Sequence, residues 1–265
     1  MPNRLARAAL TITAAALLLT GCATSATGGA SSPESATPTG VHGRITVFAA
    51  ASLTTSFTRI GREFEAAYPG ATVTFSFAGS SDLVTQLTEG APADVFASAV
   101  EGNMQKAVKA GVTSGPPVRF ATNVLSIAVP PGNPAKIRAF ADLARSGVKT
   151  VVCAPQVPCG AATAKVEASS GTALSPVSQE SSVTDVLGKV ESGEADAGIV
   201  YATDVKAAGA KVATVPFPEA ADVVNEYPIA TIAGSAQPAT ARAFVAFVAG
   251  PQGRAVLRAA GFGAP

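Results

Sequence analysis

Short apolar runs alternate with helical apolar spacing along most of this chain. Residues 45–48 are mainly β-branched or aromatic, which predicts a buried strand. From Leu53 to Phe64 the apolar residues recur every three or four positions, as on one face of a helix. Residues 72–77 alternate polar and apolar, which predicts a second strand, and a helical segment follows from Asp82. The chain therefore opens with two successive strand–helix units.

The same alternation continues to the C-terminus. Further strands are predicted at 94–97, 120–129, 150–152, 197–200, 212–217 and 227–232. Further helices are predicted at 103–110, 137–145, 161–169, 183–190, 238–248 and 251–260. Strands that alternate with helices are typical of α/β folds with right-handed crossovers. We therefore expect an α/β fold with mainly parallel sheets.

Two of the predicted strands run into turns of small, hydroxyl-bearing residues. Three alanines and Ser52 follow the first strand, and an Ala-Gly-Ser-Ser turn containing Ser80 follows the second. Ser52 is predicted to cap the next helix, and a plain capping serine is the alternative to a binding role. A helix start offers unpaired N–H donors and partial positive charge to an anion. Because such turns line the ligand crevice of open α/β sheets, the pair favours a binding site.

The first 21 residues have the pattern of an export signal. Arg4 and Arg7 precede an apolar segment that is too short to span a bilayer as a mature helix. The sequence Leu-Leu-Thr-Gly-Cys, ending at Cys22, resembles a lipoprotein cleavage box. We therefore expect residues 1–21 to be removed and Cys22 to be lipidated, which would anchor the protein outside the cytoplasm without spanning the membrane. An ordinary secretory signal or a free cysteine is the alternative.

Residues 22–43 are rich in Ser, Thr, Gly, Pro and Ala, and so predict a flexible tether. This segment holds His42, the only histidine among the 265 residues. A Ser-His-Asp triad would need that histidine, and a multi-histidine metal site is excluded. Loss of the signal removes two of the 19 basic and none of the 18 acidic residues, so the net charge becomes −1. The mature chain therefore has no basic excess for nucleic acid.

Five segments carry a family resemblance: VFAAASLT, FAGSSDL, GAPADVFASA, VPCGAATAK and GIVYATD. In this order they resemble the periplasmic molybdate-binding proteins of ABC transporters, from about Arg44 to the C-terminus. The resemblance implies a two-lobed, type II periplasmic-binding-protein fold that holds a tetrahedral oxyanion between its lobes. It also implies two crossings between lobes, near Asn123 and Tyr227. The expected lobes are residues 44–122 with 227–265, and residues 123–226.

The turns and the resemblance together predict a ligand site without charged side chains. The expected donors are the hydroxyls of Ser52, Ser80 and Tyr201 and the backbone N–H groups of Cys159 and Val183. Rigid neutral dipoles can stabilise an anion without a counter-ion. No cofactor is expected, and molybdenum is expected only inside the oxyanion, with no direct protein ligand. A donor-only site suits a fully deprotonated oxyanion and rejects protonated phosphate.

The predicted site also implies which related ions should bind and how the affinity should depend on pH. Sulfate is smaller than molybdate, so a cavity too wide for all donors to reach it at once is the expected filter. Tungstate nearly matches molybdate in size and charge and is expected to bind as well. None of the proposed donors titrates near neutrality, so the affinity is expected to be nearly flat between about pH 6.5 and 8.5.

Cys159 departs from the family pattern, which often has alanine there. Cys153 lies close by in the sequence, and two nearby cysteines in an exported protein favour a disulfide. Two free thiols or a metal site are the alternatives, although two thiols without histidine make a poor zinc site. Asp204 is expected to cap the helix after Tyr201 without touching the ligand.

These observations predict a lipid-anchored, monomeric, extracytoplasmic receptor and not an enzyme. It would deliver molybdate or tungstate to an ABC permease with its ATPase. The alternatives are a receptor for another oxyanion such as sulfate, a serine hydrolase using Ser52 or Ser80, and a surface adhesion module. The hydrolase lacks an evident general base beside either serine.

Overall fold

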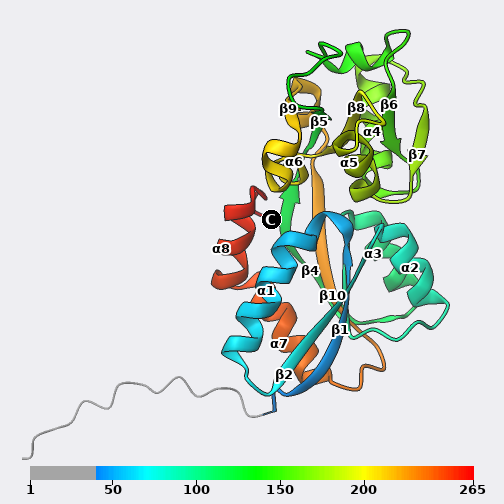
Figure 1. The fold of residues 1–265 in the computed structure, drawn as a ribbon. Helices are drawn as coiled ribbons and strands as arrows, with labels where there is room; N and C mark the ends of the chain where they lie inside the picture. Colours follow the sequence, from blue (N-terminus) through cyan, green and yellow to red (C-terminus); the bar gives the residue numbers. More distant parts are fainter. Residues whose placement is uncertain (1–39) are drawn as a thin grey trace, which may run out of the picture. The chain divides into compact units, whose positions relative to one another are not determined.

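The computed structural model describes residues 40–265, which form two five-stranded sheets with flanking helices (Figure 1). The strand order is β2-β1-β3-β10-β4 in the first sheet and β7-β6-β8-β5-β9 in the second. The predicted signal peptide, Cys22 and the tether up to residue 39 lie outside the described residues. None of the helices in the described part has the length and apolar character needed to cross a membrane.

The first sheet and its helices form the first lobe. Its strands are β1 (Gly43–Ala50), β2 (Ala71–Ala78), β3 (Val95–Ala97), β4 (Thr113–Asn123) and β10 (Asn225–Ile232). Its helices are α1 (Thr54–Ala67), α2 (Ser80–Thr88), α3 (Glu101–Lys109), α7 (Pro238–Ala249) and α8 (Pro251–Ala260). A short 3-10 turn, η1 (Ala51–Leu53), joins β1 to α1.

The second sheet and its helices form the second lobe. Its strands are β5 (Leu125–Val129), β6 (Thr150–Cys153), β7 (Ser178–Glu180), β8 (Ala197–Tyr201) and β9 (Ala213–Val215). Its helices are α4 (Pro158–Ser170), α5 (Val183–Glu191) and α6 (Ala202–Ala208). Three 3-10 segments complete the described elements: η2 (Phe140–Ala144), η3 (Gly209–Lys211) and η4 (Pro218–Asp222).

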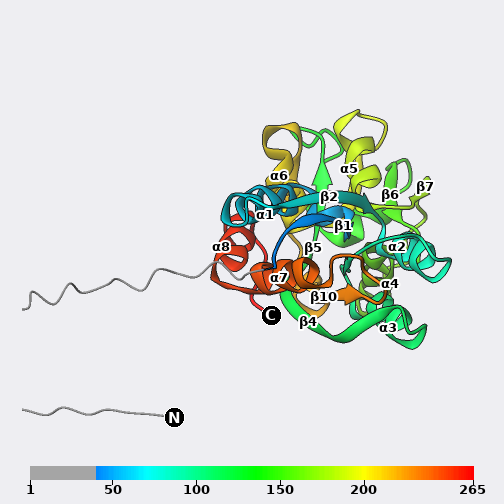
Figure 2. The ribbon, with the colours of Figure 1, turned by 90° about the horizontal axis from the view of Figure 1, so that it is seen from below.

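The two faces of the first sheet are covered by different helices because side chains alternate along each strand. Ile45 and Val47 of β1 lie in one core with residues of α1, α7 and α8. Phe48 of β1 and Phe96 of β3 lie in another core with residues of α2 and α3. Figure 2 shows α1, α7 and α8 on one side of this sheet and α2 and α3 on the other. Both faces are buried, so β1 has the nearly continuous apolar sequence of a central strand.

The α/β fold class is confirmed, and the two sheets prove to be mixed. In the first sheet, β1 pairs in parallel with β2 and β3, while β10 is antiparallel to both β3 and β4. The second sheet has the same pattern, because β6 is parallel to β7 and β8 while β5 is antiparallel to β8 and β9. Strand direction is decided by the long-range connections that cross between lobes, and these leave no mark in the local sequence.

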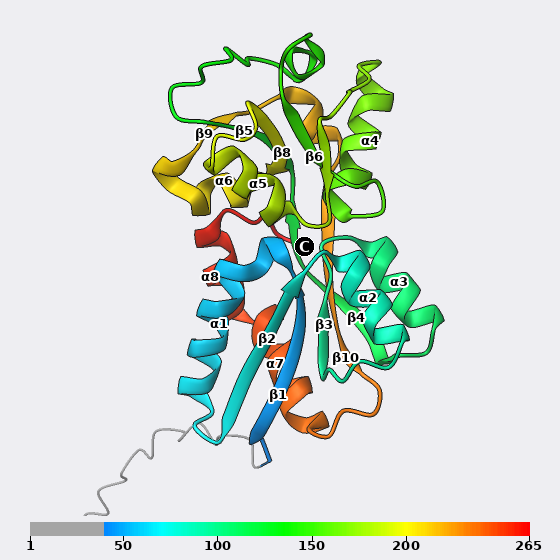
Figure 3. The same cartoon turned by 45° about the vertical axis from the view of Figure 1, so that its right-hand side comes forward.

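The predicted extended run at 120–129 is two strands that belong to different sheets. β4 ends at Asn123 and β5 begins at Leu125, so the chain leaves the first lobe at Val124. The Asn123 side chain accepts a hydrogen bond from the Val124 N–H (3.0 Å), which takes that donor out of sheet pairing. The chain returns through β10, whose first residue, Asn225, is the register partner of Asn123. Figure 3 shows β4 and β10 side by side where the lobes meet.

The helix predicted at 137–145 is wrong, because only η2 forms there. The side chain of Asp142 accepts hydrogen bonds from the backbone N–H groups of Arg138 (2.7 Å) and Ala139 (3.1 Å). The side chain of Asn133 bonds both backbone groups of Ile137. Short polar side chains thus satisfy the backbone groups that a helix start would need, which competes with α-helix.

Two extended segments were not predicted. β7 has only three residues and no apolar alternation. β4 begins at Thr113, well before the predicted start, although Pro116 and Pro117 interrupt its pattern. β4 is an edge strand paired only with β10, and edge strands tolerate proline.

The described fold begins slightly before the expected end of the tether. Gly43 is the first residue of β1, and the backbone of His42 is held by Thr240 of α7. The N–H of His42 donates to Thr240 Oγ1 (3.0 Å), and the Thr240 hydroxyl donates to the His42 carbonyl (2.7 Å). His42 therefore lies at the base of the first lobe, away from the carboxyl ends of the strands.

Candidate functional site

All five predicted ligand residues line one small cavity between the lobes. The full lining is Ala50, Ala51, Ser52, Gly79, Ser80, Ala99, Val157, Pro158, Cys159, Val183 and Tyr201. The cavity has a volume of only about 10 Å³. A volume of this order holds one water molecule or one comparably small group. The cavity therefore has no room for a sugar or an amino acid, and a tetrahedral oxyanion would have to widen it.

The first lobe contributes the turns that follow β1 and β2. Ser52 lies in η1, and its side chain makes no helix cap; its Oγ lies 3.0 Å from the Tyr227 hydroxyl instead. The expectation that Ser52 caps the next helix is therefore wrong, because a tertiary partner on β10 takes the hydroxyl. Ser80 is the first residue of α2, and its Oγ accepts a hydrogen bond from the Ala99 N–H (3.0 Å).

The second lobe contributes two helix starts and a strand end. Cys159 is in the first turn of α4, after Pro158, and Val183 is the first residue of α5. The first N–H groups of a helix have no intrahelical acceptor, so both remain available to a ligand. Ser182 caps α5 by accepting from the Asp185 N–H. Tyr201 ends β8 and is buried against the cavity.

The electrostatics of this cavity come from dipoles, because no charged side chain is among its lining residues. The starts of α2, α4 and α5 all meet there, and each carries partial positive charge. Burial raises the pKa of the Tyr201 hydroxyl well above its usual value, with a smaller contribution from Tyr227. Burial likewise raises the pKa of Tyr227. Both phenols are therefore neutral O–H groups at physiological pH.

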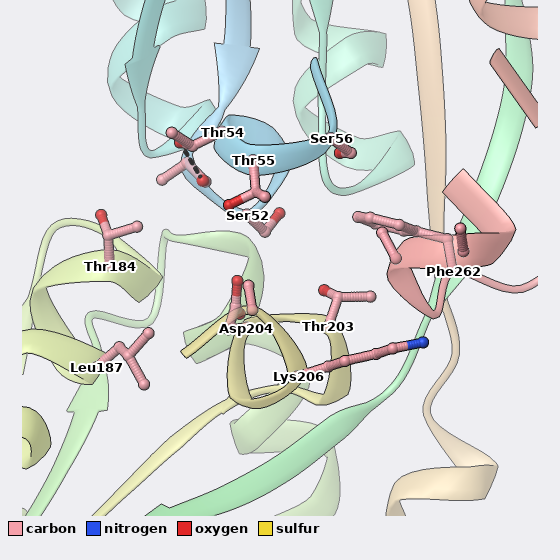
Figure 4. Close-up of a pocket in the computed structure, with 14 residues that line it drawn as sticks. Ser52, Thr54, Thr55, Ser56, Thr184, Leu187, Thr203, Asp204, Lys206 and Phe262 are labelled. Atoms are coloured by element: carbon pink, nitrogen blue, oxygen red, sulfur yellow. Dashed lines mark hydrogen bonds between the residues drawn. The ribbon is translucent and has the colours of Figure 1, made fainter. Parts of the chain in front are cut away.

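A wider cavity of about 340 Å³ adjoins the small one and shares Ala51 and Ser52 with it. Figure 4 shows Ser52 and Thr55 of the first lobe opposite Asp204 and Thr203 of the second. Lys206 also lines this space, which is walled largely by apolar atoms. The donors predicted for the ligand converge on the smaller cavity, so we assign the candidate site there.

Asp204 lies just behind the site and holds the start of α6. Its Oδ2 accepts from the Tyr201 N–H (2.9 Å), as expected for a residue that caps this helix. Burial raises the pKa of Asp204 from 3.8 to about 7, partly offset by that hydrogen bond. Its negative charge also raises the pKa values of Tyr201 and Tyr227. The flat pH profile expected from the sequence did not take a raised pKa of this carboxyl into account.

We expect Asp204 to make both stability and affinity depend on pH. Because its folded pKa is raised, it stabilises the fold fully below about pH 4, and this contribution is lost as the pH rises to about 7. The loss is at most about 4 kcal/mol. Asp204→Asn keeps an acceptor for Tyr201 and removes the buried charge. Urea unfolding at pH 5 and pH 8 should therefore show a smaller pH-dependent loss of stability in the variant than in the wild type.

A bound dianion should repel ionised Asp204 and so favour its protonated form. Binding above about pH 7 should then take up as much as one proton, and the affinity should fall as the pH rises through that value. Calorimetry in two buffers of different ionisation enthalpy measures this uptake. An equal, proton-free heat for the wild type and Asp204→Asn would show that Asp204 does not sense the ligand.

Cys153 and Cys159 are joined by a disulfide, with their Cα atoms 5.7 Å apart. The bridge ties the end of β6 to the first turn of α4, next to the cavity. In the chain-entropy account, closing this short loop adds roughly 2–2.5 kcal/mol. The disulfide therefore holds the helix start that presents the Cys159 N–H.

Removing the disulfide should cost stability and spare binding. We expect the double variant Cys153→Ala, Cys159→Ala to melt about 4–9 °C lower. Its affinity should stay within about threefold of the wild type, because the proposed donor at 159 is main chain. Calorimetry and a melting curve on the same sample separate the two effects. Loss of binding by a folded double variant would contradict the backbone role of Cys159.

Sequence reasoning missed the polar side chains that hold the hydroxyls from behind. Asn225 Nδ2 lies 2.9 Å from the Tyr201 hydroxyl, and Asn123 Nδ2 lies 3.4 Å from the Tyr227 hydroxyl. Each asparagine stands at the end of a crossing strand that the local sequence does not connect to the site. Within residues 40–265, no group of three His, Cys, Asp or Glu side chains is placed to hold a metal ion.

Comparison with known proteins gives a consistent family. Residues 45–263 match the family described as bacterial extracellular solute-binding protein. The chain is 54% identical over 239 residues to the molybdate-binding protein ModA of Mycobacterium tuberculosis, covering 89% of this chain and 92% of the relative. It is 34% identical to the ModA protein of Escherichia coli, covering 83% and 89%.

Solved structures show the same fold at lower sequence identity. A periplasmic molybdate-binding protein of Azotobacter vinelandii matches with a TM-score of 0.71 at 24% identity, over 83% of this chain and 99% of the other. The sulfate-binding protein SubI of M. tuberculosis matches with a TM-score of 0.73 at 24% identity, over 83% and 86%. The two-lobed arrangement is thus shared by proteins named for different oxyanions.

Proposed function

Because this chain belongs to the family of bacterial extracellular solute-binding proteins, we propose that it captures molybdate outside the cytoplasm for an ABC importer. Members of this family bind solutes and are not enzymes. The observation that carries the proposal is the small interlobe cavity, on which five neutral donor groups converge. The two ModA relatives, which are named molybdate-binding proteins, support the choice of ligand.

The proposed ligand set is the hydroxyls of Ser52, Ser80 and Tyr201 with the N–H groups of Cys159 and Val183. Two hydroxyls come from the first lobe and the other donors from the second. A ligand that bonds both lobes favours the closed state over an open one. The proposed lobe limits are residues 44–122 with 227–265, and residues 123–226. The passage of the chain out of the first sheet after Asn123 and back into it at Asn225 supports two crossings within two residues of these limits.

Lipid attachment at Cys22, tungstate binding, a monomeric state and delivery to a permease with its ATPase belong to the same proposal. The cleavage box that ends at Cys22 supports the lipid anchor. The near-equal size and charge of tungstate support its binding. Mass spectrometry of the membrane-associated protein would test the anchor, because acylation adds the mass of the acyl chains to a chain that begins at Cys22.

The serine hydrolase alternative lacks support in the site. Ser80 Oγ accepts from a backbone N–H, and Ser52 Oγ is paired with a phenol whose pKa is raised, so neither serine is hydrogen-bonded to a general base. The backbone of His42, the only histidine, is tied to Thr240 of α7. These contacts agree with the family, whose members are not enzymes.

Titration calorimetry with molybdate, tungstate, sulfate and phosphate tests the proposal. We expect molybdate and tungstate to bind tightly, sulfate much more weakly and phosphate not at all. Sulfate binding tighter than molybdate would make the protein a sulfate receptor. No heat with any of the four ions would overturn oxyanion binding.

A further inference from the structure

We propose that Asn225 and Asn123 are positioning residues that fix which way the cavity hydroxyls point their hydrogens. The inference rests on the proposed function, oxyanion binding in this cavity. Both side chains are buried, each with 4% of its surface exposed, and neither lines the cavity itself. They lie behind Tyr201 and Tyr227, at register partners of β10 and β4.

The amide of Asn225 can be oriented in one way only. One of the two terminal atoms of its side chain lies 2.9 Å from the Ala99 carbonyl oxygen and also 2.9 Å from the Tyr201 hydroxyl oxygen. A carbonyl oxygen only accepts, so this atom must be the amide nitrogen. Its second hydrogen then points at Tyr201, whose oxygen must accept. The Tyr201 hydrogen is then available to an acceptor in the cavity, with the neighbouring Tyr227 hydroxyl as the other acceptor within reach.

The same residue, Ala99, also sets Ser80. The Ala99 N–H donates to Ser80 Oγ (3.0 Å), and a backbone N–H can only donate. Ser80 Oγ therefore accepts on the side away from the cavity, and its own hydrogen is free to point toward the cavity. The backbone of Ala99 thus acts on Ser80 through its N–H and on Tyr201 through its carbonyl and Asn225.

Asn123 acts in the same way on Ser52, through Tyr227. Its Oδ1 accepts from the Val124 N–H (3.0 Å), so the other terminal atom must be the nitrogen. That nitrogen donates to Thr203 Oγ1 (2.7 Å) and, over a longer distance of 3.4 Å, to the Tyr227 hydroxyl. Tyr227 can then donate to Ser52 Oγ, 3.0 Å away, and this direction leaves the Ser52 hydrogen for the ligand.

The result is a cavity into which all three hydroxyls can point a hydrogen, because another group bonds each hydroxyl oxygen from outside the cavity. With the N–H groups of Cys159 and Val183, every proposed contact requires an acceptor on the ligand. An oxyanion that carries a proton would bury that proton without a partner, which is costly. Hydroxyls free to rotate could accept from such a ligand, so the selectivity depends on the asparagines behind them.

Asn225→Asp should reverse the direction of the hydrogen bond between this side chain and the Tyr201 hydroxyl. The shape of the side chain hardly changes. The oxygen that replaces Nδ2 carries at most one hydrogen, and the Ala99 carbonyl takes it. Tyr201 must then donate to that oxygen in either protonation state, and it turns a lone pair into the cavity. A protonated oxyanion gains an acceptor, while a fully deprotonated one loses a donor.

The readout is selectivity, which a purely structural role would leave unchanged. Calorimetry at pH 7 gives the Kd for molybdate and for arsenate, which carries a proton at that pH. We expect the arsenate-to-molybdate ratio of Kd values to fall at least tenfold in Asn225→Asp. Asn103→Asp is the matched control, because Asn103 is a buried asparagine of α3, away from the cavity, and it should keep the wild-type ratio.

The outcomes separate this inference from the proposed function. Wild-type protein that gives no heat with molybdate overturns the function. If the wild-type protein binds molybdate and Asn225→Asp weakens the binding of molybdate and arsenate equally, the positioning role is overturned. The proposed function then still stands. If Asn225→Asp does not fold, Asn225→Ala decides, because it frees the Tyr201 hydroxyl to rotate and should lower the ratio by a smaller factor.

Discussion

Gly79→Ala should weaken molybdate binding by about 5- to 150-fold while the protein stays folded. A Cβ atom at this position would lie 2.2 Å from the backbone carbonyl oxygen of Ser181. Gly79 precedes α2 in the first lobe, and Ser181 lies before α5 in the second, so the clash arises only when the lobes are together. The range corresponds to an overpacking cost of about 1–3 kcal/mol placed on the closed state.

The fold itself should accept the alanine. Gly79 has φ −58° and ψ 136°, a conformation open to any residue, so each lobe remains unstrained. The Ser181 carbonyl has no easy way to move, because the chain there leads into α5, which carries the proposed donor at Val183. The two lobes would therefore close incompletely or would displace the N–H donor of Val183.

Calorimetry with molybdate measures the loss, and small-angle scattering with and without the ligand reports on closure. Gly188→Ala in α5 is the matched control, because a Cβ there meets open space. It should keep the affinity and slightly raise the melting temperature, as alanine does inside a helix. Unchanged affinity in Gly79→Ala would mean that the ligand-bound lobes do not approach each other at this contact.

Removing single hydroxyls from the cavity should cost about 10- to 150-fold in affinity each. Ser52→Ala, Ser80→Ala and Tyr201→Phe each delete one hydrogen bond to a charged ligand, worth roughly 1.5–3 kcal/mol. Tyr201→Phe should also lower the stability of the fold, because it leaves an amide hydrogen of buried Asn225 without its acceptor. The loss should appear in the Kd from calorimetry.

Ser56→Ala is the matched control for these three variants. Ser56 is a buried serine one turn farther along, and its Oγ donates to the Leu53 carbonyl rather than into the small cavity. It should keep wild-type affinity and lose only a little stability. If Ser52→Ala and Ser80→Ala also bind like the wild type, the ligand sits elsewhere, and the wider cavity beside Ser52 becomes the place to look.

The order of strands and helices could be predicted from the sequence because it depends on local spacing. α7 (Pro238–Ala249) and α8 (Pro251–Ala260) lie within one residue of their predicted limits, since a proline near each start and apolar periodicity mark them. Local patterns failed where side chains satisfied the backbone in another way, as Asp142 does in η2. They also failed for β7, which is too short and polar to carry a pattern.

The residues that line the candidate site could be predicted from the sequence, because they follow strand ends in recognisable segments. Ser52, Ser80, Cys159, Val183 and Tyr201 line one cavity as expected. The sequence by itself thus determined the elements, the family resemblance and the residue types that line the small cavity.

Only the tertiary structure decided what stands behind and between those residues. Asn225 follows Tyr201 by 24 positions and Asn123 precedes Tyr227 by 104, so no local pattern could join them. The raised pKa of Asp204 and the contact of Gly79 with Ser181 likewise exist only once two lobes enclose them. Hydrogen-bond direction, desolvation and steric fit depend on neighbours in space, and these are set by how the chain crosses between its two sheets.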